Sequence, residues 1–239
     1  MRYHTGKRAV VVYGPPGSGK GTQAELLARL FGFIHLDTGR YIESVVHAPG
    51  ASKDPVLKRE GKNFDTGKLC TPSWVLKVMS DAATHIAESG SSVVFSGAPR
   101  TTPEAFGLQY AEGETNVPKV GGLVAVLTKL YGKKNITFVK LVVREASSRK
   151  RNSQRLICSV CGTPALAHAH PKYCSFCGGP MRRRTLDAPS VITVRLKQYR
   201  DRTYPIFAVM KKHGYRVIEV NGEPAPCKVH EAVKKAVGL

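Results

Sequence analysis

The chain has 239 residues, a length typical of one large α/β domain that carries insertions. Its 42% hydrophobic and 23% charged residues exclude a chain that is disordered throughout. The 37 Lys and Arg residues against 17 Asp and Glu give a formal charge of +20, which indicates anionic partners. No apolar run approaches the roughly 18 residues that span a bilayer, and the first residues lack the apolar core of a secretory signal. We therefore expect a cytoplasmic protein that does not act at a membrane.

Short β-rich runs alternate with helical stretches along the chain, the pattern typical of βαβ units. The first run, RAVVVY at 8–13, is uninterrupted and favours a strand buried in a parallel sheet. The predicted strands are 8–13, 33–36, 92–96, 136–143 and 215–219. The predicted helices are 22–31, 73–89, 122–131, 191–213 and 228–237. The fold class is therefore α/β, with a five-stranded parallel sheet flanked by helices.

Two segments interrupt this alternation and are predicted to be insertions at the edge of the sheet. The first, 37–72, is too long for a simple connection, and the second, 154–187, is rich in Cys, Gly and Pro. The core domain is then expected to comprise 1–36, 73–153 and 188–239.

A glycine-rich loop, GPPGSGK, follows the first predicted strand directly and leads into a helix. This context is typical of a P-loop, in which backbone N–H groups and the positive end of the helix surround phosphate oxygens. The lysine supplies an ammonium group for the β- and γ-phosphates. The residues expected to bind ATP here are Gly17, Ser18, Gly19, Lys20, Gly21 and Thr22.

The loop ends in GKGT, with a glycine between the lysine and the threonine, and so resembles adenylate kinases and their nucleoside monophosphate kinase relatives. Three further stretches are similar to landmarks of that family: DTGR at 37–40, GKLCT at 67–71 and SGAPRT at 96–101. The resemblance implies reversible phosphoryl transfer from ATP to a nucleoside monophosphate (NMP), and it makes 37–72 an NMP-binding insertion. The NMP-binding residues expected at the matching positions are Thr38, Lys68, Leu69, Cys70, Gly97, Arg100, Glu104, Arg184 and Arg195. Arg40, in the same segment as Thr38, is expected to substitute for the family's phosphate-binding arginine, whose position is occupied by Glu43.

Several positions depart from the family pattern. Arg40 and Ser96 stand where the family has aspartates that organise magnesium, and Glu43 stands where it has an arginine for the acceptor phosphate. Glu104 replaces a glutamine that contacts adenine. A carboxylate only accepts hydrogen bonds, and guanine offers two adjacent donors. The family resemblance favours AMP as acceptor, and Glu104 leaves GMP or another NMP open.

Four cysteines in the second insertion have the spacing C-x2-C-x12-C-x2-C, which is typical of a tetrahedral zinc site. The predicted ligands of a structural Zn²⁺ are Cys158, Cys161, Cys174 and Cys177. His168 and His170 lie between the two pairs and are expected to be surplus. Some adenylate kinases carry such a zinc-binding lid at this place, so the resemblance implies that 154–187 closes over the donor nucleotide.

The resemblance also assigns the arginines around this insertion. It implies that Arg151 contacts the donor base and that the turn at Glu223 contacts the donor adenine, so both are expected to bind ATP together with Arg155. The catalytic residues it implies are Lys20, Arg100, Arg155, Arg184 and Arg195. Magnesium is expected with ATP, and the family expectation is a monomer.

A second hypothesis belongs to another class of protein. A kinase-like domain retained to bind RNA or a ribosomal particle would also be strongly basic and would lack acidic residues at positions 40 and 96. Aromatic residues that could stack on unpaired bases are sparse, with Tyr173 and Phe176 in the second insertion. Nucleic acid is therefore a possible but not a favoured partner.

Overall fold

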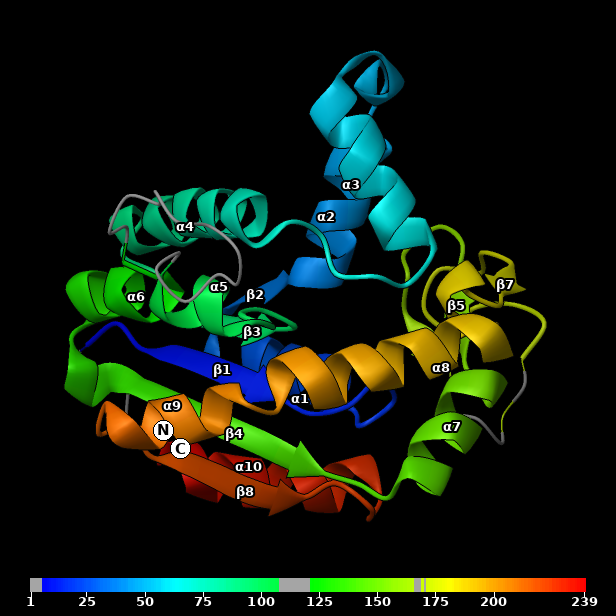
Figure 1. The fold of residues 1–239 in the computed structure, drawn as a ribbon. Coiled ribbons are helices and arrows are strands. Elements are labelled where there is room, and N and C mark those ends of the chain that lie inside the picture. Colours follow the sequence, from blue (N-terminus) through cyan, green and yellow to red (C-terminus); the bar gives the residue numbers. More distant parts are fainter. Residues whose placement is uncertain (1–5, 108–120, 166–168, 170) are drawn as a thin grey trace.

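The computed structural model describes residues 6–107, 121–165, 169 and 171–239, and its centre is a five-stranded parallel sheet (Figure 1). The strands lie in the order β2-β3-β1-β4-β8. They are β1 (Ala9–Tyr13), β2 (Ile34–Asp37), β3 (Val93–Ser96), β4 (Ile136–Val142) and β8 (Val217–Asn221). The predicted fold class is confirmed, and each predicted strand lies within two residues of its observed bounds. His168 and His170 lie outside the described residues.

Both faces of the central strand β1 are buried, and β1 is apolar at every position. Ala9, Val11 and Tyr13 face one hydrophobic cluster, and Val10 and Val12 face another. The first cluster is closed by α4 (Pro72–Glu88) and α6 (Leu123–Tyr131). The second is closed by α1 (Lys20–Phe31) and α10 (Pro226–Val237). An α/β core with helices on both faces leaves its functional groups at the carboxyl ends of the strands.

The helix predicted at 191–213 is wrong as a single helix. The chain instead forms α8 (Pro189–Gln198), a π-helical turn at Tyr199–Thr203, and α9 (Ile206–Lys212). Pro205 accounts for the break, because proline donates no backbone hydrogen bond and its ring collides with the carbonyl four residues earlier. The Tyr204 amide bonds to Tyr199 O at 2.8 Å, which widens the last turn before the proline.

Several helices were not predicted. In the first insertion α2 (Thr38–Val46) and α3 (Pro55–Asp65) stand away from the sheet (Figure 1). Asp37 and Asp54 cap these two helices by accepting hydrogen bonds from backbone N–H groups of the first turn. The remaining helices that were not predicted are α5 (Thr102–Phe106) and α7 (Glu145–Gln154), with short 3₁₀ turns at Ala51–Lys53, Lys133–Asn135 and Thr185–Asp187.

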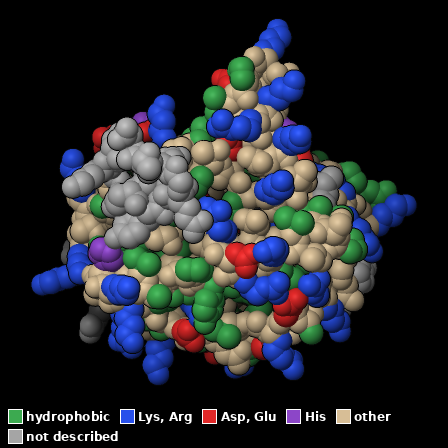
Figure 2. Space-filling model, viewed as in Figure 1, with side chains coloured by type: hydrophobic (Ala, Val, Ile, Leu, Met, Phe, Trp, Pro, Cys, Tyr) green, Lys and Arg blue, Asp and Glu red, His purple; other side chains and the backbone are tan. Residues whose placement is uncertain are grey.

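The second insertion carries its own small sheet, beyond the end of α7. This sheet is antiparallel, with β5 (Leu156–Cys158) between β6 (Pro164–Ala165) and β7 (Met181–Arg182). Figure 2 shows Lys and Arg side chains spread over the visible face and onto the projecting α2–α3 segment. In the described part of the chain, no helix is both long and apolar enough to cross a membrane.

Candidate active site

The loop between β1 and α1 can be formed only with glycine at particular positions. Gly14, Gly17 and Gly19 adopt φ angles of +151°, +76° and +92°. A Cβ atom at Gly14 would lie 2.9 Å from Leu141 O, and one at Gly17 would lie 2.7 Å from Ser148 O. The loop is therefore pressed against β4 and α7, and it aims the amino end of α1 at the space above the sheet.

The remaining predicted ATP-binding residues of this loop lie at the start of α1. Gly21 and Thr22 occupy its first turn. Ser18 is buried, and its hydroxyl has no hydrogen-bond partner among the described residues. Thr38, at the start of α2, has a buried hydroxyl that likewise has no hydrogen-bond partner among the described residues. Unpartnered buried hydroxyls are uncommon in folded proteins. Of these two residues, Thr38 also lines a pocket.

Lys20 is turned back onto its own loop. Its Nζ donates hydrogen bonds of 2.8 Å to both Gly14 O and Pro15 O. Burial, followed by the positive charges of nearby arginines, lowers the pKa of Lys20 well below its usual range, and Asp37 opposes this shift. The arginines concerned are Arg100, Arg195 and Arg155.

The same cluster of cations affects Arg195. Burial and then Arg100 lower the pKa of Arg195 to about 9. Burial also lowers the pKa of Arg184. Buried groups of like charge raise the free energy of the charged state, and a bound polyanion removes that penalty. The electrostatics of this region therefore suit phosphate groups.

Two pockets adjoin at this cluster. The first has a volume of about 490 Å³ and is lined by Lys20, Arg100 and Arg195. The second has a volume of about 350 Å³ and lies between α2 and the start of α4. Leu69, Gly97 and Arg100 line both pockets, so Arg100 borders the space for a ligand in either one. Its Nε donates a hydrogen bond to Gly97 O.

Most of the residues expected to bind the NMP surround the second pocket. Those that line it are Thr38, Lys68, Leu69, Cys70, Gly97, Arg100 and Glu104. Burial raises the pKa of the Cys70 thiol to about 12, so this cysteine is an apolar neighbour to a ligand rather than a charged one. Arg195 lines the first pocket instead.

Arg40 and Arg184 connect the two insertions. Arg40 Nη2 donates to Cys161 O at 3.3 Å, so the residue at the start of α2 contacts the cysteine loop. Arg184 Nη2 lies 3.6 Å from the Glu43 carboxylate on α2. In this structure the first insertion therefore contacts the second at two points.

Glu104 is held in place while it lines the second pocket. It is only 2% exposed, its Oε2 accepts from Arg100 N at 2.7 Å, and its Oε1 accepts from the Thr101 hydroxyl at 3.0 Å. Burial raises the pKa of Glu104, although these hydrogen bonds oppose the shift. Each carboxylate oxygen has a second lone pair, so Glu104 can still accept hydrogen bonds from a ligand.

Asp187 was not predicted, although it organises two of the expected catalytic arginines. Arg155 binds it through Nε at 2.9 Å and Nη2 at 2.5 Å, and Arg195 Nη1 lies 3.5 Å away. The Asp187 side chain is only 3% exposed. A signal was available in the sequence, because Asp187 and Asp201 are the only acidic residues between Arg149 and Arg202.

At the other end of the P-loop, α7 holds the turn that follows β8. Arg151 donates hydrogen bonds of 2.8 Å to both Gly222 O and Glu223 O. The Glu223 carboxylate accepts from Arg144 N at 2.7 Å. Gly222 also lies against Ser18 O of the P-loop, since a Cβ atom there would approach it to 3.3 Å. The turn is thereby fixed beside the loop.

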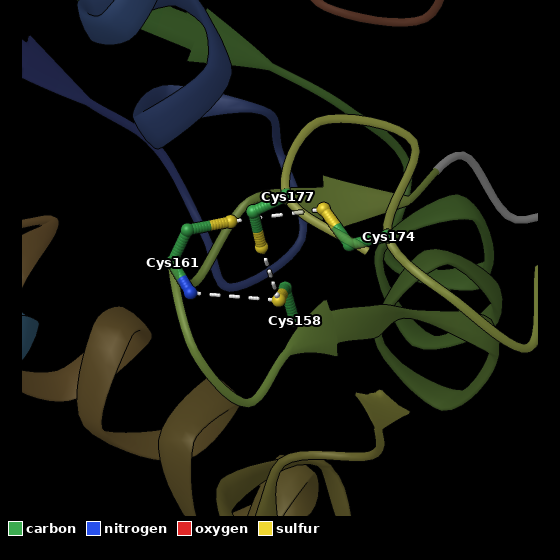
Figure 3. Close-up of side chains that lie close together, drawn as sticks. All are labelled: Cys158, Cys161, Cys174 and Cys177. Atoms are coloured by element: carbon green, nitrogen blue, oxygen red, sulfur yellow. Dashed lines mark hydrogen bonds between the residues drawn. The ribbon is translucent and has the colours of Figure 1, made fainter. Parts of the chain in front are cut away.

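The four cysteines form one cluster, as Figure 3 shows. Their sulfur atoms all lie within 4.8 Å of one another, with 3.4 Å between Cys158 and Cys177 and 3.7 Å between Cys161 and Cys174. Tetrahedral Zn–S bonds of about 2.3 Å place sulfurs about 3.8 Å apart. Backbone N–H groups of Cys161 and Phe176 point at the sulfurs of Cys158 and Cys174, each at 3.4 Å, and favour thiolates. The cluster is compatible with a zinc site.

Fold and site together define a P-loop nucleotide kinase, in which a parallel α/β core places a phosphate-binding loop beside a second, arginine-lined pocket. A family model described as adenylate kinase matches residues 12–215. The adenylate kinase of Pelobacter propionicus is 29% identical over 209 residues, 86% of either chain. That of Caldicellulosiruptor saccharolyticus is 27% identical over 234 residues, 96% of this chain and 99% of the relative. The chain belongs to the adenylate kinase family and is a nucleoside monophosphate phosphotransferase, and its cysteine cluster is consistent with the zinc-lid type.

Proposed function

We propose that this protein transfers the γ-phosphoryl group of ATP reversibly to AMP, so that ATP and AMP become two molecules of ADP. The observation that carries the proposal is the pair of adjoining pockets with Arg100 in the lining of both. The two relatives described above are adenylate kinases, which supports AMP as the acceptor.

In the proposed reaction an oxygen of the AMP phosphate attacks the γ-phosphorus of ATP, and the bond from that phosphorus to the β–γ bridging oxygen breaks. The electron pair stays on the leaving β-phosphate, so no protein nucleophile is needed. Catalysis then consists of alignment, charge stabilisation and exclusion of water.

Each cation has a place in this scheme. Lys20 would leave the carbonyls of Gly14 and Pro15 for the β- and γ-phosphates. Arg100, in the lining of both pockets, would clamp the acceptor phosphate, since a guanidinium presents paired donors to two oxygens. Arg155 and Arg195, which Asp187 holds side by side, would stabilise the charge on the phosphoryl group in flight.

Magnesium is the cation implied with ATP, and the side chains near the P-loop fit it. Asp37 and Ser96 end β2 and β3, and Thr22 lies in the first turn of α1. All three offer oxygen atoms, which Mg²⁺ prefers, and Mg²⁺ commonly keeps several of its waters. When bound, the ion neutralises phosphate charge.

We further propose that the two insertions act as the NMP-binding segment (37–72) and as a zinc-stabilised lid (154–187) around the core segments 1–36, 73–153 and 188–239. The Arg40 contact to Cys161 O supports an arrangement in which both insertions close over the substrates together. Closure would exclude water from the phosphates. A zinc ion held by four cysteines leaves no open coordination position and would be structural.

A second acceptor, GMP, is favoured by one specific observation. Glu104 presents carboxylate oxygens to the second pocket, and guanine has two adjacent N–H donors that match an acceptor-only group.

The test measures nucleoside diphosphate formation from MgATP, with AMP, GMP, CMP and UMP offered separately to zinc-loaded protein. Fastest turnover with AMP supports the proposal, and a preference for GMP makes Glu104 the residue that sets specificity. Absence of turnover with all four acceptors, in protein that still binds ATP, contradicts the proposal and favours the RNA-binding hypothesis. The Lys20→Met variant is the control for contaminating kinase, and its expected rate is at background.

A further inference from the structure

Three side chains from three different elements form a hydrogen-bonded row beside the P-loop. Glu25 lies on α1, His35 on β2 and Ser96 at the end of β3. His35 Nδ1 is 3.1 Å from Glu25 Oε2, and His35 Nε2 is 2.8 Å from the Ser96 hydroxyl. Arg29 holds the other carboxylate oxygen of Glu25 at 2.7 Å. None of these residues has a role in the proposed reaction so far, apart from the oxygen that Ser96 offers.

The order of this row determines which way each proton points. The Glu25 carboxylate can only accept, so His35 Nδ1 carries the hydrogen. In the neutral imidazole Nε2 is then an acceptor, and the Ser96 hydroxyl must donate to it. The single hydrogen of the Ser96 hydroxyl is therefore used by His35. Toward a partner other than His35 the Ser96 oxygen can only accept a hydrogen bond, as a carboxylate oxygen would.

The neighbours of Ser96 show where that acceptor lies. In the sheet register Ser96 is paired with Val12 on β1, just before the P-loop, and with Asp37 on β2. Asp37 is two residues from His35 and therefore on the same face of β2. Its Oδ1 accepts both capping hydrogen bonds of α2, and its Oδ2 accepts none from any residue in the described ranges. The negative charge of Asp37 raises the pKa of Lys20, in opposition to burial and to the nearby arginines.

We infer that His35, oriented by Glu25, is a positioning residue that makes the Ser96 hydroxyl an acceptor for the water shell of the magnesium carried by ATP, beside the carboxylate of Asp37. This inference rests on the proposed function, because it requires a phosphate-bound cation at the P-loop. Position 96 has no acidic side chain, and the row of Glu25, His35 and Ser96 presents an oxygen acceptor there instead. Magnesium keeps waters that need such acceptors.

The test is equilibrium binding of a non-hydrolysable ATP analogue at pH 8, measured once with Mg²⁺ and once with EDTA. The loss of one hydrogen bond predicts that His35→Gln and Ser96→Ala each weaken binding about three- to tenfold with Mg²⁺ and less than about twofold with EDTA. The double variant is expected to bind no more weakly than either single variant. His85→Gln, an exposed histidine on α4, is the matched control and is expected to bind as the parent does.

A purely structural role for His35 would weaken binding equally with and without Mg²⁺, and this result, or no loss at all with Mg²⁺, would overturn the inference. Ser96→Asp provides a second check, because a carboxylate at 96 needs no histidine to be an acceptor. In that background His35→Gln is expected to leave Mg²⁺-dependent binding unchanged, and a loss there contradicts the inference. Because the readout is binding, a protein that shows the Mg²⁺-selective loss yet phosphorylates no acceptor would refute the proposed function and not this inference.

Discussion

Replacement of Glu104 by glutamine tests how the second pocket chooses its base. The carboxylate accepts one hydrogen bond from Arg100 N and one from the Thr101 hydroxyl. The glutamine oxygen can keep the first, and its amide can donate to the Thr101 oxygen, so the structural cost is about 1 kcal/mol or less. The principal effect is therefore expected on the ligand side of the pocket.

On the side of the second pocket that faces the ligand, Glu104→Gln replaces one hydrogen-bond acceptor, a carboxylate oxygen, with one donor, an amide N–H. Adenine presents a donor and an acceptor on neighbouring atoms, so Glu104→Gln gains a hydrogen bond to AMP and loses one to GMP. At about 1 to 1.5 kcal/mol for each hydrogen bond, the preference for AMP over GMP shifts by about 2 to 3 kcal/mol. The ratio of kcat/KM for AMP to that for GMP is therefore expected to rise roughly thirty- to 150-fold.

The assay is coupled measurement of kcat/KM for both acceptors at saturating MgATP, in the parent and in Glu104→Gln. Glu43→Gln is a matched control, since Glu43 lies on α2 and contacts Arg184 rather than the lining of the second pocket. A ratio that changes less than threefold in Glu104→Gln, with both variants folded, would refute the assignment of Glu104 to the acceptor base.

Three further outcomes are expected. The raised pKa of Glu104 favours its neutral form in the folded state, so its stabilising contribution is present at acid pH and is lost as pH rises above about 4.5 and through the folded pKa. The melting temperature of Glu104→Gln relative to that of the parent should therefore rise between pH 4 and 8. A difference that stays constant over this range would contradict the reasoning. Arg155→Ala leaves buried Asp187 with Arg195 alone, so thermal melts should show a loss of up to about 3 kcal/mol of stability. Activity assays should show a fall in kcat of at least about a hundredfold. An unchanged kcat would show that Arg155 is not a catalytic residue. Chelation of the metal should release about one zinc ion per chain and lower kcat while ATP-analogue binding to the P-loop persists, and metal analysis that finds no zinc in active protein would refute the lid proposal.

The parts of the fold that were predicted correctly depend on local pattern. The inner strands β1 and β3 are almost wholly apolar, because a strand buried on both faces needs apolar side chains, whereas the edge strands β2 and β8 include polar residues and are only partly buried. The cysteine cluster was predictable for a similar reason, since its ligand spacing is local. By contrast, α7 reads EASSRKRNSQ and has no apolar face, and it is held by the buried Ser148 and Asn152 at the P-loop. No periodicity could have indicated it.

The parts of the site that were missed depend on contacts between distant residues. Asp187 binds Arg155 across 32 positions, and His35 binds Ser96 across 61. Such pairs arise from the order of strands and from the path of an insertion, neither of which leaves a spacing in the sequence. In the sequence, Ser96 shows only that the family's aspartate is absent at this position. The hydrogen-bonded row from Glu25 to Ser96 can be recognised only when the pairing of β2 with β3 is known.

The proposed function requires that two nucleotides bind side by side and exchange a phosphoryl group. Its most direct test starts from MgADP alone and follows the nucleotides by phosphorus NMR. ATP and AMP are expected to appear in equal amounts, without inorganic phosphate, and the Lys20→Met variant is expected to produce neither. Unchanged ADP, or ADP converted to AMP and inorganic phosphate, would contradict it.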